Sequence, residues 1–124
     1  MPAVAAKTIL VVEDSATTRK FLRLSLESES LRVCEAADGI EALELLAQVK
    51  PDLFLVDLNM PRMDGLTLVQ RLRANPDYTV TPIVMLTTQN TAEDRRNGYA
   101  AGVNVYLTKP IESEKLQYKV QCLL

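Results

Sequence analysis

Short runs of consecutive apolar residues alternate along the chain with segments in which apolar residues recur every three or four positions. The runs predict five strands, at residues 9–12, 31–36, 53–56, 83–86 and 103–108. A continuous run of Val, Ile and Leu is typical of a strand that is covered on both faces. The run at 31–36 is more polar, which indicates a strand at the edge of the sheet.

The segments between these strands predict helices. The first begins after Ser15, a favourable N-cap residue. Its inner face is expected to carry the residues at helical spacing, which are Thr18, Phe21, Leu22, Ser25 and Leu26. The second begins after Asp38, with Glu41 in a capping-box position, and Lys50-Pro51 is expected to end it. Its inner stripe is expected to be Ile40, Leu43, Leu46 and Ala47.

Three further helices are predicted at residues 65–73, at 91–101 and from Ser113 onward. The helix at 91–101 is weak, because its apolar stripe is thin and an internal glycine such as Gly98 costs about 1 kcal/mol against alanine. Gly102 is expected to end it. The last helix repeats apolar residues at Leu116, Val120, Leu123 and Leu124.

Strands that alternate with helices predict one parallel sheet with helices on both of its faces. A chain of 124 residues suits a single domain with one core. In open parallel sheets of this kind, ligands bind at the carboxyl ends of the strands. The polar residues that follow the apolar runs are therefore the candidates for function.

The net charge of -2 gives no basic excess that would hold a nucleic-acid backbone. The apolar runs are far shorter than the roughly 18 residues that a membrane span needs. Residues 1–7 have no signal-peptide pattern, so we expect a cytoplasmic protein without direct contact to nucleic acid or membrane. Cys34 and Cys122 form no motif and are expected to be reduced. The chain has no histidine, which excludes His-based triads, His–metal sites and a phosphohistidine of its own.

Acidic and basic residues close the predicted strands. Glu13 and Asp14 follow the first strand, Asp57 follows the third, Thr87 follows the fourth and Lys109 follows the fifth. Carboxylates gathered at one edge repel and raise each other's pKa unless a cation lies between them.

Oxygen ligands without His or Cys favour Mg²⁺, which leaves coordination positions open for phosphate oxygens. A metal held in this way can neutralise an incoming phosphoryl group and orient Asp57 as an attacking carboxylate. Lys109 supplies a positive charge for the same group, and the Thr87 hydroxyl can bond one of its oxygens.

At these positions the chain strongly resembles the response-regulator receiver family, the phospho-acceptor modules of two-component signalling. The resemblance extends from Lys7 to the C-terminus, which leaves residues 1–6 as a flexible N-terminal segment and 7–124 as the receiver domain. It is carried by Val12-Glu13-Asp14-Ser15, by the stretch from Asp57 to Gly65, by Thr87 and by Tyr106-Leu107-Thr108-Lys109-Pro110. It implies a flavodoxin-like, doubly wound, three-layer α/β/α fold with five helices and strand order 2-1-3-4-5.

The resemblance also implies a role for each site residue. Asp57 would accept the phosphoryl group, and Asp14, Asp57 and the backbone carbonyl of Asn59 would hold Mg²⁺. Glu13, where many family members have a second aspartate, would act through the waters of the metal. Lys109, ahead of a cis peptide bond to Pro110, would pair with the acyl phosphate.

Two pairs of residues would act after phosphorylation. Thr87 would move toward the phosphoryl group while the Tyr106 ring swaps between outward and inward rotamers. Asn59 and Gln89 would tune the lifetime of the phosphoryl group.

The function implied is a phosphorylation-operated switch. A sensor histidine kinase or phosphotransfer protein would donate the phosphoryl group, and an effector would bind the face formed by the fourth helix, fifth strand and fifth helix. The chain would catalyse only its own phosphorylation and dephosphorylation. The pathway, either motility control or a phosphorelay, stays open, as does whether the chain is part of a longer regulator.

Two other functions are compatible with part of this set of residues. A Mg²⁺-dependent phosphatase or phosphotransferase with Asp57 as nucleophile commonly needs a second carboxylate two residues on, where this chain has Asn59. A phosphorylation-independent interaction module would have no need of the complete set of acids, lysine and threonine. Each residue alone also has a structural reading: a loop cap for Asp57, a favourable helix N-terminus for Glu13-Asp14, a solvated charge for Lys109 and half-buried packing for Tyr106.

Overall fold

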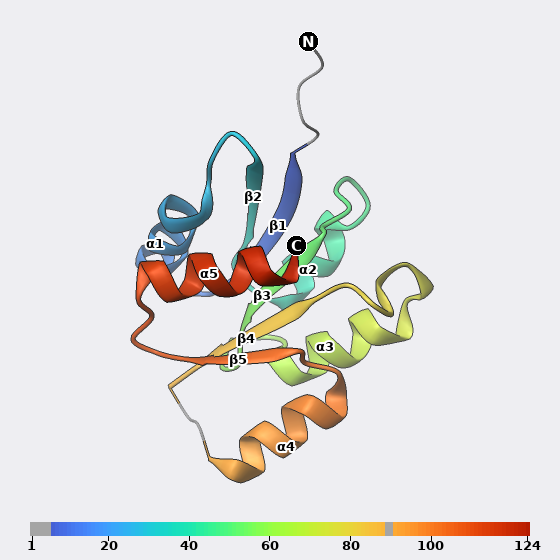
Figure 1. Ribbon diagram of the computed structural model, residues 1–124. Helices are drawn as coiled ribbons and strands as arrows, with labels where there is room; N and C mark the ends of the chain where they lie inside the picture. Colours follow the sequence, from blue (N-terminus) through green and yellow to red (C-terminus); the bar gives the residue numbers. More distant parts are fainter. Residues whose placement is uncertain (1–5, 89–90) are drawn as a thin grey trace.

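The computed structural model describes residues 6–88 and 91–124. Within them, five parallel strands form one sheet in the order β2-β1-β3-β4-β5 (Figure 1). The strands are β1 (Lys7–Val12), β2 (Leu31–Ala36), β3 (Leu53–Asp57), β4 (Ile83–Thr87) and β5 (Val105–Thr108). The helices are α1 (Ala16–Leu26), α2 (Gly39–Leu45), α3 (Gly65–Ala74), α4 (Ala92–Ala101) and α5 (Ser113–Leu123), with a short 3₁₀ helix, η1 (Pro76–Tyr78), after α3. The predicted three-layer fold, strand order and five helices are confirmed.

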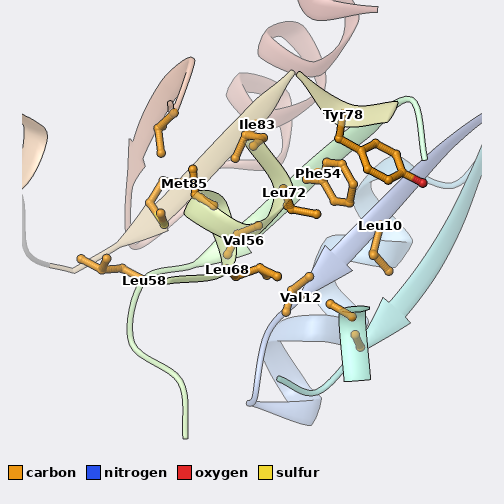
Figure 2. Close-up of a cluster of buried hydrophobic side chains, with 14 residues drawn as sticks. Leu10, Val12, Phe54, Val56, Leu58, Leu68, Leu72, Tyr78, Ile83 and Met85 are labelled. Atoms are coloured by element: carbon orange, nitrogen blue, oxygen red, sulfur yellow. The ribbon is translucent and has the colours of Figure 1, made fainter. Parts of the chain in front are cut away.

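Helices cover both faces of the sheet, so the strands are apolar on both sides. On one face, Leu22 and Leu26 of α1 and Leu116 and Val120 of α5 pack against β1, β3 and β4. On the other face, the α3 side chains pack over the central strands (Figure 2). All five residues of β3 are buried, including Asp57.

The topology brings the ends of β1 and β3 together. β1 pairs with β2 on one side and β3 on the other, and Val12 is aligned with Val56. The connection that follows β1 therefore leads to β2 on one side of it, and the next connection leads to β3 on its other side. This reversal creates a topological switch point at the carboxyl edge of the sheet. The residues that follow Val12 and Val56 meet at this edge.

The strands differ from the prediction at their ends. β3 and β4 extend to Asp57 and Thr87, so both candidate site residues are the last residues of strands rather than the first residues of loops. β1 starts earlier than predicted, at Lys7, and β5 starts later, at Val105. β2 lies at the sheet edge, as its polar pattern indicated.

Two predicted helix faces were partly wrong. Phe21, which was expected on the inner face of α1, is 41% exposed. The buried stripe of this helix consists of Leu22 and Leu26 and is narrower than predicted. Helix α2 ends at Leu45, well before Lys50-Pro51, and continues as turns. Its buried side chain is that of Ala42, whereas Ala47 is exposed.

Side-chain caps fix the helices that begin at the carboxyl edge of the sheet. The capping residues accept hydrogen bonds from backbone N–H groups at the starts of α1, α2, α3 and α4, and they are Ser15, Asp38, Asp64 and Thr91. At the other end of α4, Gly102 has φ 117° and ends the helix, as predicted. Among the described residues, none of the helices combines the length and the apolar character that a membrane span requires.

Candidate functional site

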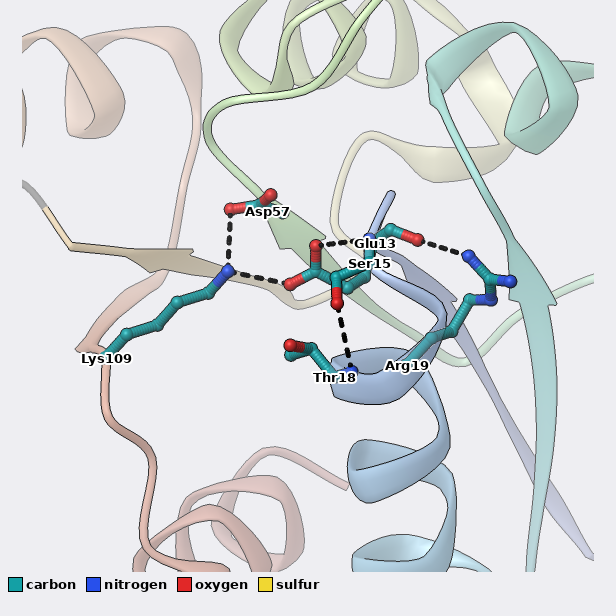
Figure 3. Close-up of polar contacts among 6 residues, drawn as sticks. All are labelled: Glu13, Ser15, Thr18, Arg19, Asp57 and Lys109. Atoms are coloured by element: carbon teal, nitrogen blue, oxygen red, sulfur yellow. Dashed lines mark hydrogen bonds and ion pairs between the residues drawn. The ribbon is translucent and has the colours of Figure 1, made fainter.

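Three acidic side chains and one lysine meet at the carboxyl edge of the sheet. Each of Glu13, Asp14 and Asp57 offers a carboxylate oxygen, and these oxygens lie within 4.8 Å of one another. The Lys109 amine lies 2.7 Å from Glu13 Oε1 and 3.3 Å from Asp57 Oδ1 (Figure 3). The structure thus brings together four residues that the sequence singles out as functional candidates.

The backbone around Asp57 is held on two sides. The N–H of Leu58 donates to the carbonyl of Leu86 on β4, and the N–H of Gly65 donates to the carbonyl of Leu58. A Cβ on Gly65 would lie 2.5 Å from the Asp57 carbonyl oxygen, so only glycine lets α3 begin this close to the strand. Asp57 is 5% exposed, which is more buried than its position before a loop indicated.

Glu13 is more deeply buried than its neighbour, at 1% exposed. Its Oε1 accepts a hydrogen bond from Lys109 and its Oε2 accepts one from the Ser15 N–H, at 3.2 Å. Its main-chain carbonyl accepts a bond of 2.7 Å from Arg19. Because protein donors engage both carboxylate oxygens, this side chain is better placed to reach a metal through water than directly.

Burial sets the electrostatics of the cluster. It raises the pKa of Glu13 to about 7, even though the hydrogen bond from Lys109 opposes the shift. Burial also raises the pKa of Asp57, against the charge of Lys109. The exposed Asp14 differs, because its hydrogen bond with Glu13 lowers its pKa. The positive charge of Lys109 therefore does not fully offset the cost of burying the negative charges of Glu13 and Asp57.

The Lys109 amine is held charged by the same contacts. Burial alone would lower its pKa, but the hydrogen bond to Glu13 and the charges of Asp57 and Glu13 raise it overall. The peptide bond between Lys109 and Pro110 is cis, as the resemblance implied, and the Lys109 N–H donates to the Thr87 carbonyl. These contacts fix a positive charge beside Asp57.

The donor set of the cluster suits Mg²⁺. Its side chains offer only carboxylate oxygens, and the exposed Asp14 leaves one side of the cluster open to solvent. A divalent cation would also relieve the repulsion that raises the pKa of Glu13 and Asp57. The residues present therefore fit the metal that the sequence predicted.

An ion pair connects the loop that carries Asn59 to the N-terminus of α2. Arg62, which has φ 67°, donates through Nε and Nη2 to Oδ2 of Asp38 at 2.7 and 2.6 Å. The hydrogen bond from the Glu41 N–H, together with Arg62, lowers the pKa of Asp38. No local sequence pattern indicates this ion pair, because its residues lie 24 positions apart along the chain. Asn59 itself is exposed.

The two predicted switch residues lie on neighbouring strands, Thr87 on β4 and Tyr106 on β5. Thr87 is 1% exposed and directly follows Leu86, which is aligned with Asp57. Tyr106 instead lies against α4, where its hydroxyl donates to the Asp94 carbonyl at 2.9 Å. Its ring makes an edge contact with Tyr99, with centroids 5.3 Å apart. Gln89 lies outside the described residues.

Comparisons with known sequences identify the family. The family model of the response regulator receiver domain matches residues 9–121. Response regulator MprA of Mycobacterium ulcerans is 40% identical over 116 residues, which are 94% of this chain and 49% of that protein. The DNA-binding dual master transcriptional regulator RpaA of Synechocystis sp. is 35% identical over 116 residues, 94% of this chain and 48% of that protein. The chain thus spans about half the length of these curated relatives.

Solved structures agree with the sequence comparisons. Chemotaxis protein CheY4 of Vibrio cholerae superposes with a TM-score of 0.92 and 36% identity, covering 97% of this chain and 100% of that one. The receiver domain of the sensor histidine kinase PA1611 from Pseudomonas aeruginosa has a TM-score of 0.86 and 34% identity, covering 96% and 98%. That structure has a magnesium ion coordinated in its active-site cleft. The chain belongs to the response regulator receiver domain family, the phospho-acceptor signalling modules of two-component systems.

Proposed function

We propose that Asp57 accepts a phosphoryl group from the phosphohistidine of a sensor histidine kinase or phosphotransfer protein, in a Mg²⁺-dependent reaction. The single observation that carries this assignment is the position of the Asp57 carboxylate. It lies within 4.8 Å of two other carboxylates and 3.3 Å from the Lys109 amine, at the end of a fully buried strand. A nucleophile held in this way has acidic ligands for a cation on one side and a fixed positive charge on the other.

In the transfer, a carboxylate oxygen of Asp57 forms a bond to phosphorus as the phosphorus–nitrogen bond of the donor breaks. The bonding electrons go to the donor's imidazole nitrogen, and an acyl phosphate remains on Asp57. Asp14, Asp57 and the Asn59 carbonyl would hold Mg²⁺, with Glu13 acting through water, and the bound ion would supply charge neutralisation for the phosphoryl oxygens. Lys109, which is already charged and adjacent, pairs with one of those oxygens and loosens its bond to Glu13.

The response follows from the added charge. The Thr87 hydroxyl moves toward the phosphoryl group, and Tyr106 on the neighbouring strand changes rotamer. The surface formed by α4, β5 and α5 then changes its affinity for an effector protein. A ligand or modification shifts such an equilibrium only as far as it prefers one state, so the acyl phosphate must interact more favourably with the rearranged form.

The proposed partners are proteins in the cytoplasm. The net charge of -2 gives no basic excess for nucleic acid, which favours a signal that passes through a protein contact. The chain is proposed to act only on its own acyl phosphate, with Asn59 and Gln89 tuning how long the group survives. Asn59 lies two residues after Asp57, where a phosphatase with an aspartate nucleophile would need a carboxylate as acid or base.

The test is the intact mass of the protein after treatment with acetyl phosphate and Mg²⁺. We expect the wild type to gain one phosphoryl group and Asp57→Asn to gain none. Asp77→Asn, an exposed acid away from the cluster, is the matched control and should behave as the wild type. A wild type without mass gain, or a gain that survives in Asp57→Asn, would contradict the proposal. Steady turnover of a phosphomonoester would instead support the phosphatase alternative.

A further inference from the structure

Helix α4 contains a glycine that its backbone conformation does not require. Gly98 lies within the regular helix Ala92–Ala101 and lacks the positive φ of Gly102. It is nonetheless the buried residue of that helix, whose other described residues are exposed or partly exposed. A glycine in a helix interior weakens it relative to alanine, so this position calls for a reason outside the helix itself.

The reason is the side chain of Tyr106. A Cβ on Gly98 would overlap the Tyr106 hydroxyl and ring edge, and the ring atom Cε2 would lie only 2.5 Å away. The ring cannot yield by a small shift, because two further contacts hold it. Its hydroxyl donates to the carbonyl of Asp94, one turn earlier in α4, and its ring makes an edge contact with the ring of Tyr99. An alanine at position 98 and the observed position of Tyr106 exclude each other.

We propose that Gly98 is a positioning residue for Tyr106. Its missing side chain forms a notch, bounded by Gly98, Tyr99 and the Asp94 carbonyl, in which the ring rests against α4. The notch fixes the resting position of the ring and so sets the starting point of any movement that Tyr106 makes.

One consequence rests on the proposed function. If Tyr106 reports phosphorylation of Asp57, filling the notch displaces the ring before any phosphoryl group arrives. Gly98→Ala should then still gain a phosphoryl group, because the residues of the acidic cluster lie at the carboxyl ends of β1 and β3, whereas the notch is part of α4. The change in the environment of Tyr106 on phosphorylation should be largely lost.

The deciding experiment needs no phosphodonor. In protein labelled with ¹³C-tyrosine, the NMR signal of Tyr106 is compared in the wild type, Gly98→Ala and Asn97→Ala. Asn97 is exposed and adjacent, so its replacement changes helix propensity without touching the ring. We expect Gly98→Ala to move the Tyr106 signal and to lower the Tyr106 pKa, which burial raises. We expect Asn97→Ala to leave both unchanged.

A stability cycle gives a second readout. With Tyr106→Ala, the notch has no occupant, and Gly98→Ala should raise the folding equilibrium constant about fivefold through helix propensity alone. With Tyr106 present, the same substitution should raise it much less or lower it. An unmoved Tyr106 signal, or an equal effect of Gly98→Ala in both backgrounds, would overturn the proposal. If Gly98→Ala alone does not fold, recovery in the double variant supports the notch and failure to recover overturns it.

The two proposals fail separately. The NMR and stability results concern the unphosphorylated protein, so they can overturn the notch while Asp57 remains the acceptor. Conversely, a wild type that gains no mass from acetyl phosphate would remove the role of Asp57 without affecting the contact between Gly98 and Tyr106.

Discussion

The acidic cluster and the α4 region are built in opposite ways. Asp57 ends β3, a strand in which every residue is buried, and strands pair with it on both sides. Helix α4 contributes a single buried residue among those described, and that residue is a glycine. The proposed phospho-acceptor is therefore held by the core of the protein, whereas Tyr106, the proposed responding residue, rests on a lightly packed helix.

This difference fits the two tasks. Phosphoryl transfer needs reacting atoms and charges at fixed distances, and a small displacement would weaken it strongly. A switch needs two arrangements that differ little in free energy, and mobile elements come from the less stable parts of a fold. The cluster lies at the ends of the buried strands β1 and β3, whereas Tyr106 packs against α4, which has a single buried residue among those described.

The largest expected effect is a difference in amide hydrogen exchange between the two regions. Amides of β3 should exchange only through global unfolding, whereas those of α4 should exchange through local opening, about a thousandfold faster. Native-state exchange measured by NMR at several denaturant concentrations tests this. Equal protection of β3 and α4 would remove the contrast between a rigid site and a mobile response element.

Removing the charge of Lys109 should affect stability next most strongly. Lys109→Met leaves the buried Glu13 and Asp57 without their cation, which should lower the free energy of unfolding by about 3 kcal/mol in metal-free buffer at pH 8. The loss should be smaller with saturating Mg²⁺, because the ion neutralises the same carboxylates. Urea unfolding measures both values. Lys115→Met, which removes an exposed amine 3.9 Å from Glu112, is the control and should have little effect.

A smaller effect is expected from pH. Burial raises the pKa of Glu13 from 4.5 to about 7, so the folded protein keeps a proton that the unfolded chain has lost. Without Mg²⁺, the free energy of unfolding should therefore fall by about 2 kcal/mol as the pH rises from 4.5 to 7. The raised pKa of Asp57 adds to the fall, while the lowered pKa of Asp14 acts only at more acidic pH.

Glu13→Gln is the control for this pH dependence, since it removes the titrating group and keeps the shape of the side chain. Most of the slope should disappear in that variant. If the free energy of unfolding of the wild type instead rose from pH 4.5 to 7, the folded protein would not be holding the extra proton that the raised pKa of Glu13 predicts.

The fold and the cluster were predictable because both follow from local patterns. A run such as Leu53-Phe54-Leu55-Val56 identifies a buried strand, and parallel strands bring their carboxyl ends to one edge. The acids and the lysine that follow such runs therefore had to approach each other. The resemblance at Asp57 and Lys109 then gave the cluster a function.

The remaining features depend on contacts between distant segments. Helical spacing placed Phe21 on the inner face of α1. The part of that face in contact with the sheet and α5 is narrower than helical spacing predicts, and Phe21 lies outside it. The ion pair between Arg62 and Asp38 joins two loops, so no local pattern indicates it. Gly98 was visible as a defect in a weak helix, and only the position of Tyr106 explains it.

The most direct test of the account is the chemical identity of the phosphorylated residue. After treatment with acetyl phosphate and Mg²⁺, borohydride reduction converts an aspartyl phosphate to homoserine, and peptide mass spectrometry locates it. The account predicts homoserine at position 57 and no conversion at Asp14. Conversion at another residue, or a phosphoryl group on a hydroxyl with Asp57 unmodified, would contradict it.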